Sequence, residues 1–191
     1  MTRIGVLALQ GDFFEHIKIL KDLGIDATEI RLPYQLDLID GLIIPGGEST
    51  TIVQLIDIYN FRQKLIQKIS QGLPTWGTCA GLIVLAGKLM DHRPKPLGLI
   101  NITVQRNAFG RQVDSFESNI KIKGLNGPTF NCIFIRAPIV TKVGKNTEIL
   151  ASIDNNRAVA VRQNNILGTS FHPELTKDTR VHELFLEMTL K

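Results

Sequence analysis

The sequence predicts an α/β fold in which helices cover both faces of a central, mostly parallel sheet. Short apolar runs alternate with stretches of helical spacing over the first half of the chain, which is typical of parallel strands joined by helices. After Leu97 the pattern becomes β-rich. One segment, Gly77-Thr78-Cys79-Ala80-Gly81, places a cysteine between an apolar run and a helix. We therefore expect a single domain over residues 1–191 with a β-rich C-terminal half.

The individual elements follow from local patterns of apolar and turn residues. In the first half we expect strands at residues 3–9, 26–31, 42–44 and 73–76, and helices at 13–23, 50–59, 61–70 and 82–85. In the second half we expect strands at 130–135 and 166–171, a hairpin turning at 154–156, and an amphipathic helix at 181–188. The carboxyl ends of parallel strands meet at one edge of a sheet, so Gln10, residues 45–50 and Cys79 should share one site.

Composition excludes several classes of protein. The hydrophobic fraction of 43% and the charged fraction of 21% are ordinary for a globular chain of 191 residues. No apolar run reaches membrane-spanning length, and residues 4–9 read as a core strand rather than a signal peptide. The net charge of +4 comes from scattered Lys and Arg, without the basic, aromatic stripe of a nucleic-acid binder. Two cysteines form no disulfide framework, so we expect a reducing compartment: the cytoplasm, or a plastid in an alga or similar source.

The segment around Cys79 has the pattern of a nucleophile elbow, a sharp turn between a strand and a helix. Glycines at positions 77 and 81 suit such a turn, because a Cβ there would collide with the neighbouring strand or helix. A sulfur at a helix N-terminus lies beside N–H groups that favour the thiolate, and the backbone N–H of Ala80 would face a substrate oxyanion. Taken alone, the pattern also fits an ordinary buried cysteine.

A second motif, His172-Pro173-Glu174, follows the strand expected at residues 166–171. Pro173 favours an extended conformation at His172, and residues two apart in an extended chain project to the same side. Glu174 can therefore reach one ring nitrogen of His172 while the other faces a thiol. With Cys79, this predicts a Cys-His-Glu catalytic triad of nucleophile, base and orienting carboxylate. A solvated helix start is the alternative interpretation of this motif alone.

A third motif, residues 45–50, follows the buried strand at 42–44. Its consecutive glycines, Gly46 and Gly47, expose backbone N–H groups that could bind an oxyanion beside the Ala80 N–H. Ser49 or Thr50 is expected to cap the next helix. A simple strand-to-helix turn is the alternative interpretation.

Together these motifs resemble class I (triad) glutamine amidotransferases: Pro-Gly-Gly-Glu-Ser-Thr at 45–50, Gly-Thr-Cys-Ala-Gly-Leu at 77–82 and Ser-Phe-His-Pro-Glu at 170–174. Three further runs resemble the glutaminase subunits of pyridoxal 5′-phosphate synthases: Leu-Ala-Leu-Gln-Gly at 7–11, Arg-Asn-Ala-Phe-Gly-Arg-Gln at 106–112 and Phe-Ile-Arg-Ala-Pro at 134–138. The resemblance extends from the first strand to the last helix. It implies the three-layer, flavodoxin-like fold of that class.

The resemblance also implies an activity and a partner. It implies hydrolysis of L-glutamine to L-glutamate and ammonia through a glutamyl thioester on Cys79, with the ammonia passed to a pyridoxal 5′-phosphate synthase subunit. No cofactor and no metal are expected. The implied glutamine pocket is formed by Gly46, Gly47, Glu48, Arg106, Ile135 and Arg136. Arginine suits the substrate carboxylate because its planar fork matches bidentate geometry, although surface charge is the alternative role for both arginines.

Other polar residues are less constrained by the sequence. Gln10 follows the first strand, and we expect it either to complete the oxyanion hole of Ala80 and Gly47 or to contact a partner. His16 is expected to face the same partner or to lie on the helix surface. Cys132, within the apolar run 130–135, is expected to be a buried structural thiol. No role is predicted for His92 and His182.

Two other functions compete with the glutaminase. One is a different cysteine hydrolase of related fold, peptidase-like or chaperone-like, which a His-Pro-Glu motif after a late strand disfavours. The other is a binding subunit that has lost its chemistry, which would require a missing triad member. Cys79, His172 and Glu174 are all present. Turnover of free glutamine separates these functions.

Overall fold

A ten-stranded mixed sheet forms the centre of the molecule in the computed structural model, which describes residues 2–106, 115–154 and 156–190. Its parallel part comprises β1 (Arg3–Leu7), β2 (Asp26–Ile30), β3 (Gly41–Ile44), β4 (Thr75–Thr78) and β12 (Ile166–Thr169). These strands lie in the order β2-β1-β3-β4-β12, and each neighbouring pair is parallel. This is the strand order of flavodoxin-like, doubly wound folds. The predicted α/β fold with a mostly parallel central sheet is confirmed.

The sheet continues into a β-rich half that is antiparallel except for the parallel pair of β5 and β6. Its strands are β5 (Ala86–Leu89), β6 (Ile100–Gln105), β9 (Ile139–Val143), β10 (Glu148–Ile153) and β11 (Arg157–Gln163). β11 joins the two halves because it pairs antiparallel with β12, β9 and β10. β7 (Ser115–Ile120) and β8 (Phe130–Ile135) form a separate antiparallel pair. The β10–β11 pairing agrees with the hairpin predicted at 154–156, of which residue 155 lies outside the described residues.

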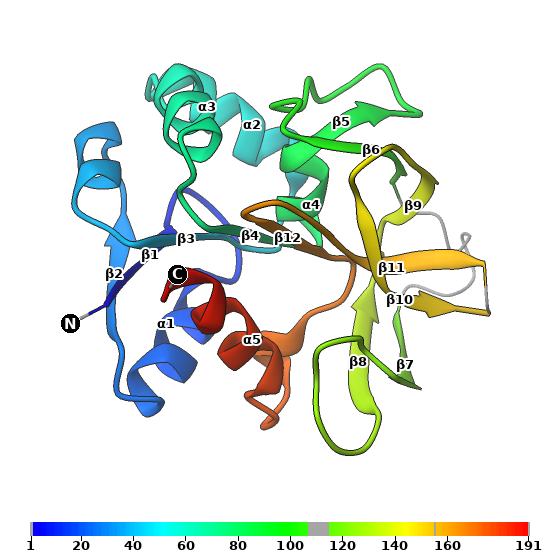
Figure 1. Cartoon of the computed structure of the whole chain (residues 1–191). Helices are drawn as coiled ribbons and strands as arrows, with labels where there is room; N and C mark the ends of the chain where they lie inside the picture. Colours follow the sequence, from blue (N-terminus) through cyan, green and yellow to red (C-terminus); the bar gives the residue numbers. More distant parts are fainter. Residues whose placement is uncertain (1, 107–114, 155, 191) are drawn as a thin grey trace.

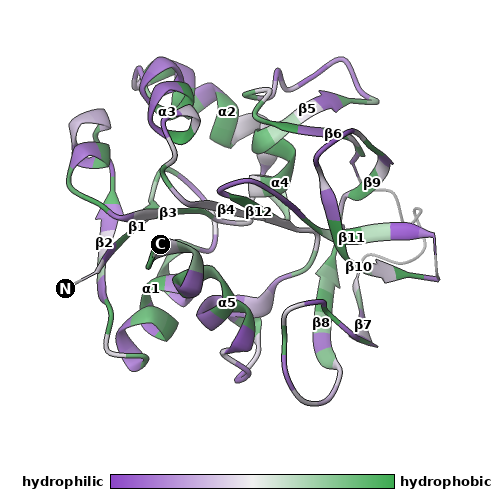
Figure 2. Ribbon diagram, in the orientation of Figure 1, coloured by the Kyte–Doolittle hydropathy of each residue, from purple (hydrophilic) through white to green (hydrophobic). Residues whose placement is uncertain are grey.

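Helices cover both faces of the parallel strands, which gives the three layers (Figure 1). α1 (Phe13–Asp22) and α5 (Arg180–Thr189) lie on one face, and α2 (Ser49–Ile58), α3 (Arg62–Ser70) and α4 (Ala80–Leu85) on the other. Short 3₁₀ turns at η1 (Pro33–Asp37) and η2 (Pro173–Leu175) complete the described elements. Every residue of α4 and β3 is buried, and both are apolar in Figure 2. These two elements therefore form the rigid support on which Cys79 is placed.

Each face of the sheet has its own hydrophobic core. One core joins α2, α3 and α4 to the sheet through residues such as Ile52, Leu65 and Leu82. The other joins α1 and α5 through Leu20, Trp76 and Phe185. Complete burial of aromatic and aliphatic side chains on both faces is what holds a parallel sheet of this kind together. A functional site must therefore lie at the strand ends.

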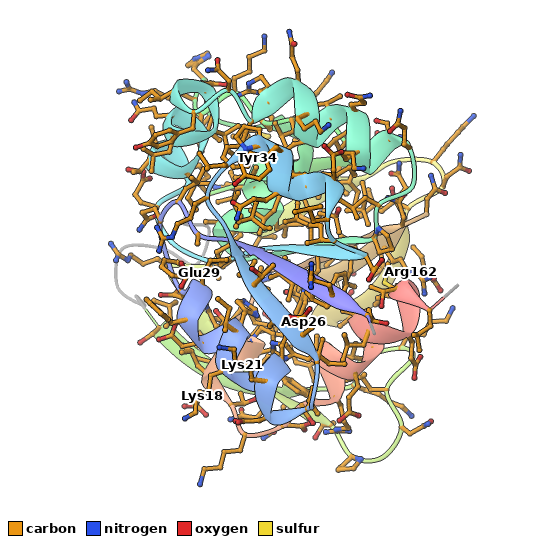
Figure 3. The ribbon with its side chains drawn as sticks, turned by 90° about the vertical axis from the view of Figure 1, so that its left-hand side faces the viewer. Lys18, Lys21, Asp26, Glu29, Tyr34 and Arg162 are labelled. Atoms are coloured by element: carbon orange, nitrogen blue, oxygen red, sulfur yellow. The ribbon has the colours of Figure 1, made fainter. Side chains whose placement is uncertain are left out.

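The outer edge of the sheet is protected by charge. Edge strand β2 presents Asp26 and Glu29, both labelled in Figure 3, and these form ion pairs with Arg3 and Arg31 at 2.6 Å. Charged side chains on an edge discourage pairing with another chain's strand. Among the described residues, every helix is too short or too polar to cross a bilayer.

Several local predictions are wrong in detail. β1 and β12 each end two residues earlier than predicted, at Leu7 and Thr169. β4 runs two residues later than predicted, through Thr78, so the strand ends directly at Cys79. The N-cap of α2 is the side chain of Glu48 rather than Ser49 or Thr50, because a carboxylate oxygen of Glu48 accepts the Thr51 N–H at 2.6 Å. A carboxylate at this position also complements the positive end of the helix dipole.

Candidate active site

Cys79 occupies the predicted elbow. It is the N-cap of α4 with φ +47° and ψ −100°, a conformation that side-chain-bearing residues rarely adopt. A Cβ on Gly81 would overlap the carbonyl oxygen of Ile44, and one on Gly77 would lie 2.5 Å from the Gly81 carbonyl. Both glycines are therefore required by close packing of β3, β4 and α4, as predicted. The strained backbone projects a reactive type of side chain from a rigid base.

His172 and Glu174 meet at the end of β12. Nδ1 of His172 lies 2.6 Å from Oε1 of Glu174, and both side chains are buried. The predicted contact is therefore present, but the backbone explanation was wrong. His172 has φ −107° and ψ 84° and precedes the 3₁₀ turn η2, so a tight turn rather than an extended segment brings Glu174 back to the ring.

The electrostatics couple the three residues. Burial lowers the pKa of His172, but hydrogen bonds to Cys79 and Glu174 and their charges outweigh it and raise the pKa to about 10. Burial raises the pKa of Glu174 against the opposing hydrogen bond from His172. A histidine bonded to a sulfur on one side and to a carboxylate on the other is placed to take the proton of that sulfur and to hold it.

A cavity of about 460 Å³ opens over Cys79 and His172. Among the predicted site residues, its lining includes Gln10, Gly47, Glu48, Cys79, Ala80, Arg106, Ile135, Arg136 and His172. Gly46 does not line it; it is buried behind, where a Cβ would lie against the ring of His172. The carbonyl oxygen of Ile135 is 3.9 Å from Sγ of Cys79. The structure thus brings segments from six parts of the chain to one hollow large enough for an amino acid.

One side of the cavity, where the oxyanion hole is predicted, is formed by the loops after β1 and β3. The backbone N–H of Glu48 donates to Oε1 of Gln10 at 2.9 Å. Gly47 has φ +147°, and a Cβ there would lie 2.6 Å from the same Gln10 oxygen. Gln10 therefore holds the glycine loop through its carbonyl oxygen. Its predicted alternative as a partner contact is compatible with its half-buried position.

Arg106 bridges this loop to the β-rich half. Its Nη1 donates to Oγ1 of Thr50 at 3.2 Å and to the carbonyl of Arg93 at 3.0 Å, and its Nη2 lies 3.8 Å from a carboxylate oxygen of Glu48. Arg136, by contrast, is exposed with φ +42°. Residues 107–112 of the predicted motif lie outside the described residues.

Sequence reasoning missed several polar groups of the site. Asp12 lines the cavity with Oδ2 3.7 Å from Nδ1 of His172. His16 is fully buried rather than on a surface or partner face, and it contacts His182 and Thr78. The sequence did contain a signal for this burial: His16 lies four residues before Leu20, a spacing that places both on the inward face of the helix.

Asp12, His172 and Glu174 are also the group within the described residues whose ligand atoms could hold a metal ion, all lying within 4.8 Å of one another. In the structure Nδ1 of His172 is engaged by Glu174. A metal ion there would compete with the hydrogen bond that orients the ring.

The second cysteine, Cys132, is buried in β8, and burial raises the pKa of its thiol to about 12. A thiol held protonated is a poor nucleophile. The prediction of a buried thiol in an apolar strand is confirmed.

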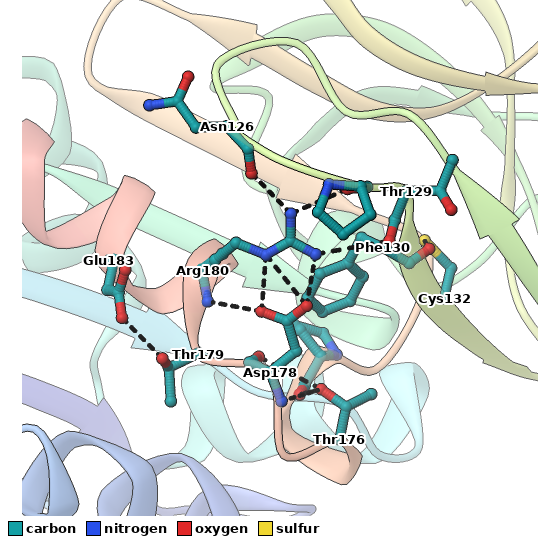
Figure 4. A network of polar contacts seen from close by, with 11 residues as sticks. Asn126, Thr129, Phe130, Cys132, Thr176, Asp178, Thr179, Arg180 and Glu183 are labelled. Carbon is teal, nitrogen blue, oxygen red and sulfur yellow. Dashed lines mark hydrogen bonds and ion pairs between the residues drawn. The ribbon is translucent and has the colours of Figure 1, made fainter.

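A polar network fixes the helix that carries His182 (Figure 4). Arg180, in the first turn of α5, donates to the carbonyls of Asn126 and Pro128 at 2.7 and 2.9 Å and to the carboxylate of Asp178. Its guanidinium also lies 5.9 Å from the centre of the Phe130 ring. This network joins α5 to the β7–β8 connection and so fixes the face of the helix toward the site.

Solved structures share this fold. A structure described as a glutamine amidotransferase is 46% identical in sequence and superposes with a TM-score of 0.93, covering 98% of this chain and 99% of that one. A GMP synthase protein of Thermoplasma acidophilum, at 18% identity and a TM-score of 0.72, covers the whole of this chain and 94% of its own. The chain therefore has the fold of the class I glutamine amidotransferases.

Sequence relatives identify the family to which this chain belongs within that class. Residues 6–191 match the model of the SNO glutamine amidotransferase family. A protein of Thermosipho africanus named pyridoxal 5′-phosphate synthase subunit PdxT is 52% identical over 99% of this chain and 100% of its own length. One of Thermotoga maritima with the same name is 48% identical over 97% of this chain and 98% of its own. This chain belongs to the SNO glutamine amidotransferase family.

Proposed function

We propose that this chain is the glutaminase subunit of a pyridoxal 5′-phosphate synthase, hydrolysing L-glutamine to L-glutamate and ammonia. One observation carries the chemistry: a cysteine on a strained elbow lies beside a histidine whose far nitrogen is 2.6 Å from a buried carboxylate. Nucleophile, base and orienter in this relation are the parts of a catalytic triad. The names of the relatives support the assignment to pyridoxal phosphate synthesis.

In the first half of the reaction Sγ of Cys79 attacks the side-chain carboxamide carbon of glutamine. His172 takes the thiol proton and delivers it to the departing nitrogen, so that ammonia leaves and a glutamyl thioester remains. The tetrahedral oxyanion is stabilised by the backbone N–H of Ala80 and by that of Gly47, with Gln10 holding the glycine loop. An oxyanion donor of this kind typically contributes about 3 kcal/mol of transition-state stabilisation.

In the second half water replaces ammonia as the reactant. His172 removes a proton from the water as it attacks the thioester carbon, and the sulfur of Cys79 leaves. Glutamate is released and the thiol is restored. Glu174 keeps the imidazole oriented and stabilises its protonated form in both steps.

Glutamine is recognised as an amino acid by groups around the same cavity. The carbonyl oxygen of Ile135 accepts from the substrate ammonium, and the guanidinium groups of Arg106 and Arg136 bind its carboxylate; all three residues line the cavity. Glu48 and the buried Gly46 shape the loop that closes the pocket. One carbonyl and two cations match the opposite charges of a zwitterion.

The ammonia is consumed on a second polypeptide. Ammonia released into water near neutral pH is largely protonated and no longer nucleophilic, so hydrolysis is useful only when the product passes directly to an acceptor site. The acceptor is a pyridoxal 5′-phosphate synthase subunit, as the word subunit in the relatives' names suggests. A free catalytic thiol requires a reducing compartment, for which we propose the cytoplasm.

Glutamate release from L-glutamine, measured with and without the synthase subunit, tests this function. We expect low activity alone, a marked rise in the complex, and none in Cys79→Ala under either condition. Equal rates with no complex detectable by sedimentation would favour a stand-alone cysteine hydrolase. No release in the presence of the partner would favour a non-catalytic subunit.

A further inference from the structure

Two histidines that the reaction above does not use are buried directly behind the triad. His16, on α1, and His182, on α5, both have 0% exposure. Nδ1 of His16 is 3.0 Å from Nε2 of His182, a hydrogen-bond distance. Nε2 of His16 lies 3.3 Å from Oγ1 of Thr78 and 3.5 Å from Oε2 of Glu174. A continuous line of polar groups therefore runs from α5 through α1 to the carboxylate that holds His172.

Each end of this line has a polar atom that the triad leaves unsatisfied. Within the described residues, Oε2 of Glu174 and Nδ1 of His182 are buried without a hydrogen-bond partner. Glu174 already uses Oε1 on His172. A buried carboxylate with one oxygen unpaired is costly, and Nε2 of His16, 3.5 Å from that oxygen, is a side-chain donor in position to pair with it. Hydrogen bonds at catalytic groups are often long without substrate and shorten in the reacting complex.

The positions of the ring protons follow from which buried donors and acceptors each tautomer leaves unsatisfied. If His16 carried its proton on Nδ1, His182 would have to place its own on Nδ1, a buried N–H with nothing to accept it. That arrangement would also direct the lone pair of His16 Nε2 at the carboxylate. With both protons on Nε2, His182 donates to His16 and His16 donates toward Thr78 and Glu174. Only an acceptor nitrogen is then left unpaired, which costs less than an unpaired donor.

We propose that His16, held in its Nε2–H tautomer by His182, is a positioning residue that donates a hydrogen bond to Oε2 of Glu174 and thereby fixes the carboxylate that orients His172. The proposal rests on the glutaminase function above. A donor on each oxygen sets the carboxylate plane, and the plane sets the imidazole that faces Cys79.

Neutrality of His16 is part of this role. Burial, with smaller effects of His182 and His172, holds the pKa of His16 well below its usual range, and burial lowers that of His182 to about 4. A neutral donor satisfies Glu174 without a second positive charge that would compete with His172 for it. The ionisable and polar groups that face the pair are Glu174, His172 and Thr78, with the Trp76 ring edge-on to both histidines and Asp12 acting on Glu174 from the cavity.

Paired amide substitutions test the proposal. The amide nitrogen of glutamine reaches about as far as imidazole Nε2, whereas the amide of asparagine reaches only the Nδ1 position. His16→Gln can therefore still donate to Glu174, and His16→Asn can contact only His182. His92→Asn is the matched control, because His92 lies exposed on the loop after β5, outside the site. Glutamate release is measured with the synthase subunit present, over a range of pH.

We expect His16→Asn to lower kcat roughly tenfold with KM within about twofold, as for outer partners of catalytic groups. The acid limb of its kcat/KM profile should shift to higher pH, because Glu174 with one donor fewer protonates more readily. His16→Gln and His92→Asn should keep the wild-type acid limb. An unchanged kcat and acid limb in His16→Asn, or equal losses in His16→Gln and His16→Asn, would overturn the proposal.

Nitrogen NMR of the wild-type chain provides a test that needs no variant to fold. Ring nitrogens that carry a proton resonate apart from those that do not, so the tautomer of each histidine can be assigned. We expect His16 and His182 to be protonated on Nε2 and bare on Nδ1. Protonation of His16 on Nδ1 would overturn the proposal. A wild-type chain inactive with its partner would instead overturn the glutaminase function, whereas the tautomers measured by NMR do not depend on activity.

Discussion

The two sides of the cavity over Cys79 differ in how firmly they are held. On the base side, the side chains of His172 and Glu174 are 5% and 0% exposed and are backed by the buried His16. On the side of the glycine loop, the side chain of Glu48 is 51% exposed. One side is set into the core, and the other is formed by loops at the surface.

Because of this difference, the groups that transfer the proton lie on the buried side, and the groups past which substrate enters lie on the exposed side. A base fixed from behind is preorganised, so little reorganisation is needed when the thiol proton moves. The opposite loop depends on Gly47 at φ +147° and on two hydrogen bonds to the loop after β1, from the Glu48 N–H to Gln10 and from the Asp12 N–H to the Gly46 carbonyl. Its exposed part, at Gly47 and Glu48, can change shape as substrate or partner arrives, whereas Gly46 stays packed against His172. Substitutions on the two sides should therefore have different effects on activity.

Removal of the nucleophile should have the largest effect. Cys79→Ala should lower glutamate release by at least roughly 10⁴-fold, because the remaining groups bind substrate but form no thioester. A glutamine-mimicking electrophile should label Cys79 and spare Cys132, whose thiol burial keeps protonated. Cys132→Ala is the control and should retain labelling. Mass mapping that placed the main adduct on Cys132 would contradict the assignment.

Loss of the orienting carboxylate should have the next largest effect. Glu174→Gln keeps the shape of the side chain but cannot stabilise the imidazolium of His172, so kcat should fall by roughly 10²- to 10⁴-fold. The variant should still be labelled at Cys79, more slowly than wild type. Asp12→Asn, at the exposed side of the same ring, is the comparison and should lose far less. Full activity in Glu174→Gln would mean that another group, with Asp12 the nearest, orients His172.

The rigidity of the elbow can be tested through stability. Gly81→Ala should lower the free energy of unfolding by roughly 3 kcal/mol or more, because the added methyl meets the backbone of Ile44, which cannot move aside in a close-packed sheet. Gly24→Asn is the control, since Gly24 has open space around it and a φ of +75° that asparagine tolerates. Denaturant titration measures both. A Gly81→Ala chain as stable as wild type would show that the elbow can adapt.

Acid should destabilise the base side before it affects the loops. The folded-state pKa of His182 is about 4 and that of His16 is also well below normal, both through burial. The unfolded chain therefore binds more protons once the pH falls below about 6.5, and stability present above that pH is lost as it falls toward about 4. His182 alone should account for roughly 3 kcal/mol.

Denaturant unfolding between about pH 7 and pH 4.5 measures this loss, and His182→Gln should flatten it. His172 has the opposite sign: its pKa is raised to about 10, so its contribution is present below about pH 6.5 and is lost as the pH rises through 10. Stability that stayed constant over the acid range would mean that the buried histidines are not neutral.

Substitution of Arg106, on the exposed loop side of the cavity, should have the smallest effect on activity. Arg106→Lys keeps the positive charge but loses the planar fork that contacts Thr50 and the Arg93 carbonyl. KM for glutamine should rise by about tenfold while kcat changes little, the sign of lost uniform binding. Lys88→Arg, a cation on β5 outside the lining of this cavity, is the control. A fall in kcat with unchanged KM would place Arg106 in the chemistry instead.

The sequence was sufficient for features fixed by local chemistry. The glycines on both sides of Cys79 indicated close backbone packing, which the structure has. The apolar periodicity indicated the alternation of strands and helices that builds the parallel part of the sheet. It was insufficient where distant segments meet. His16 and His182 are far apart in the chain, and neither has a motif, so only folding of α1 against α5 reveals that they share a hydrogen bond. Likewise, the 3₁₀ turn that joins His172 to Glu174 could not be distinguished from an extended segment by spacing alone.

The position of β12 has a consequence for how the chain is made. β12 pairs with β4 in register from Ile166 and Thr75, although it is synthesised long after β4. Until then β4 has an open edge, and the sulfur on the elbow has no base, because His172 and Glu174 follow β12 directly. A nascent chain therefore carries the nucleophile long before it can use it. Catalytic competence therefore requires that β12 has paired with β4, after His172 and Glu174 have been made.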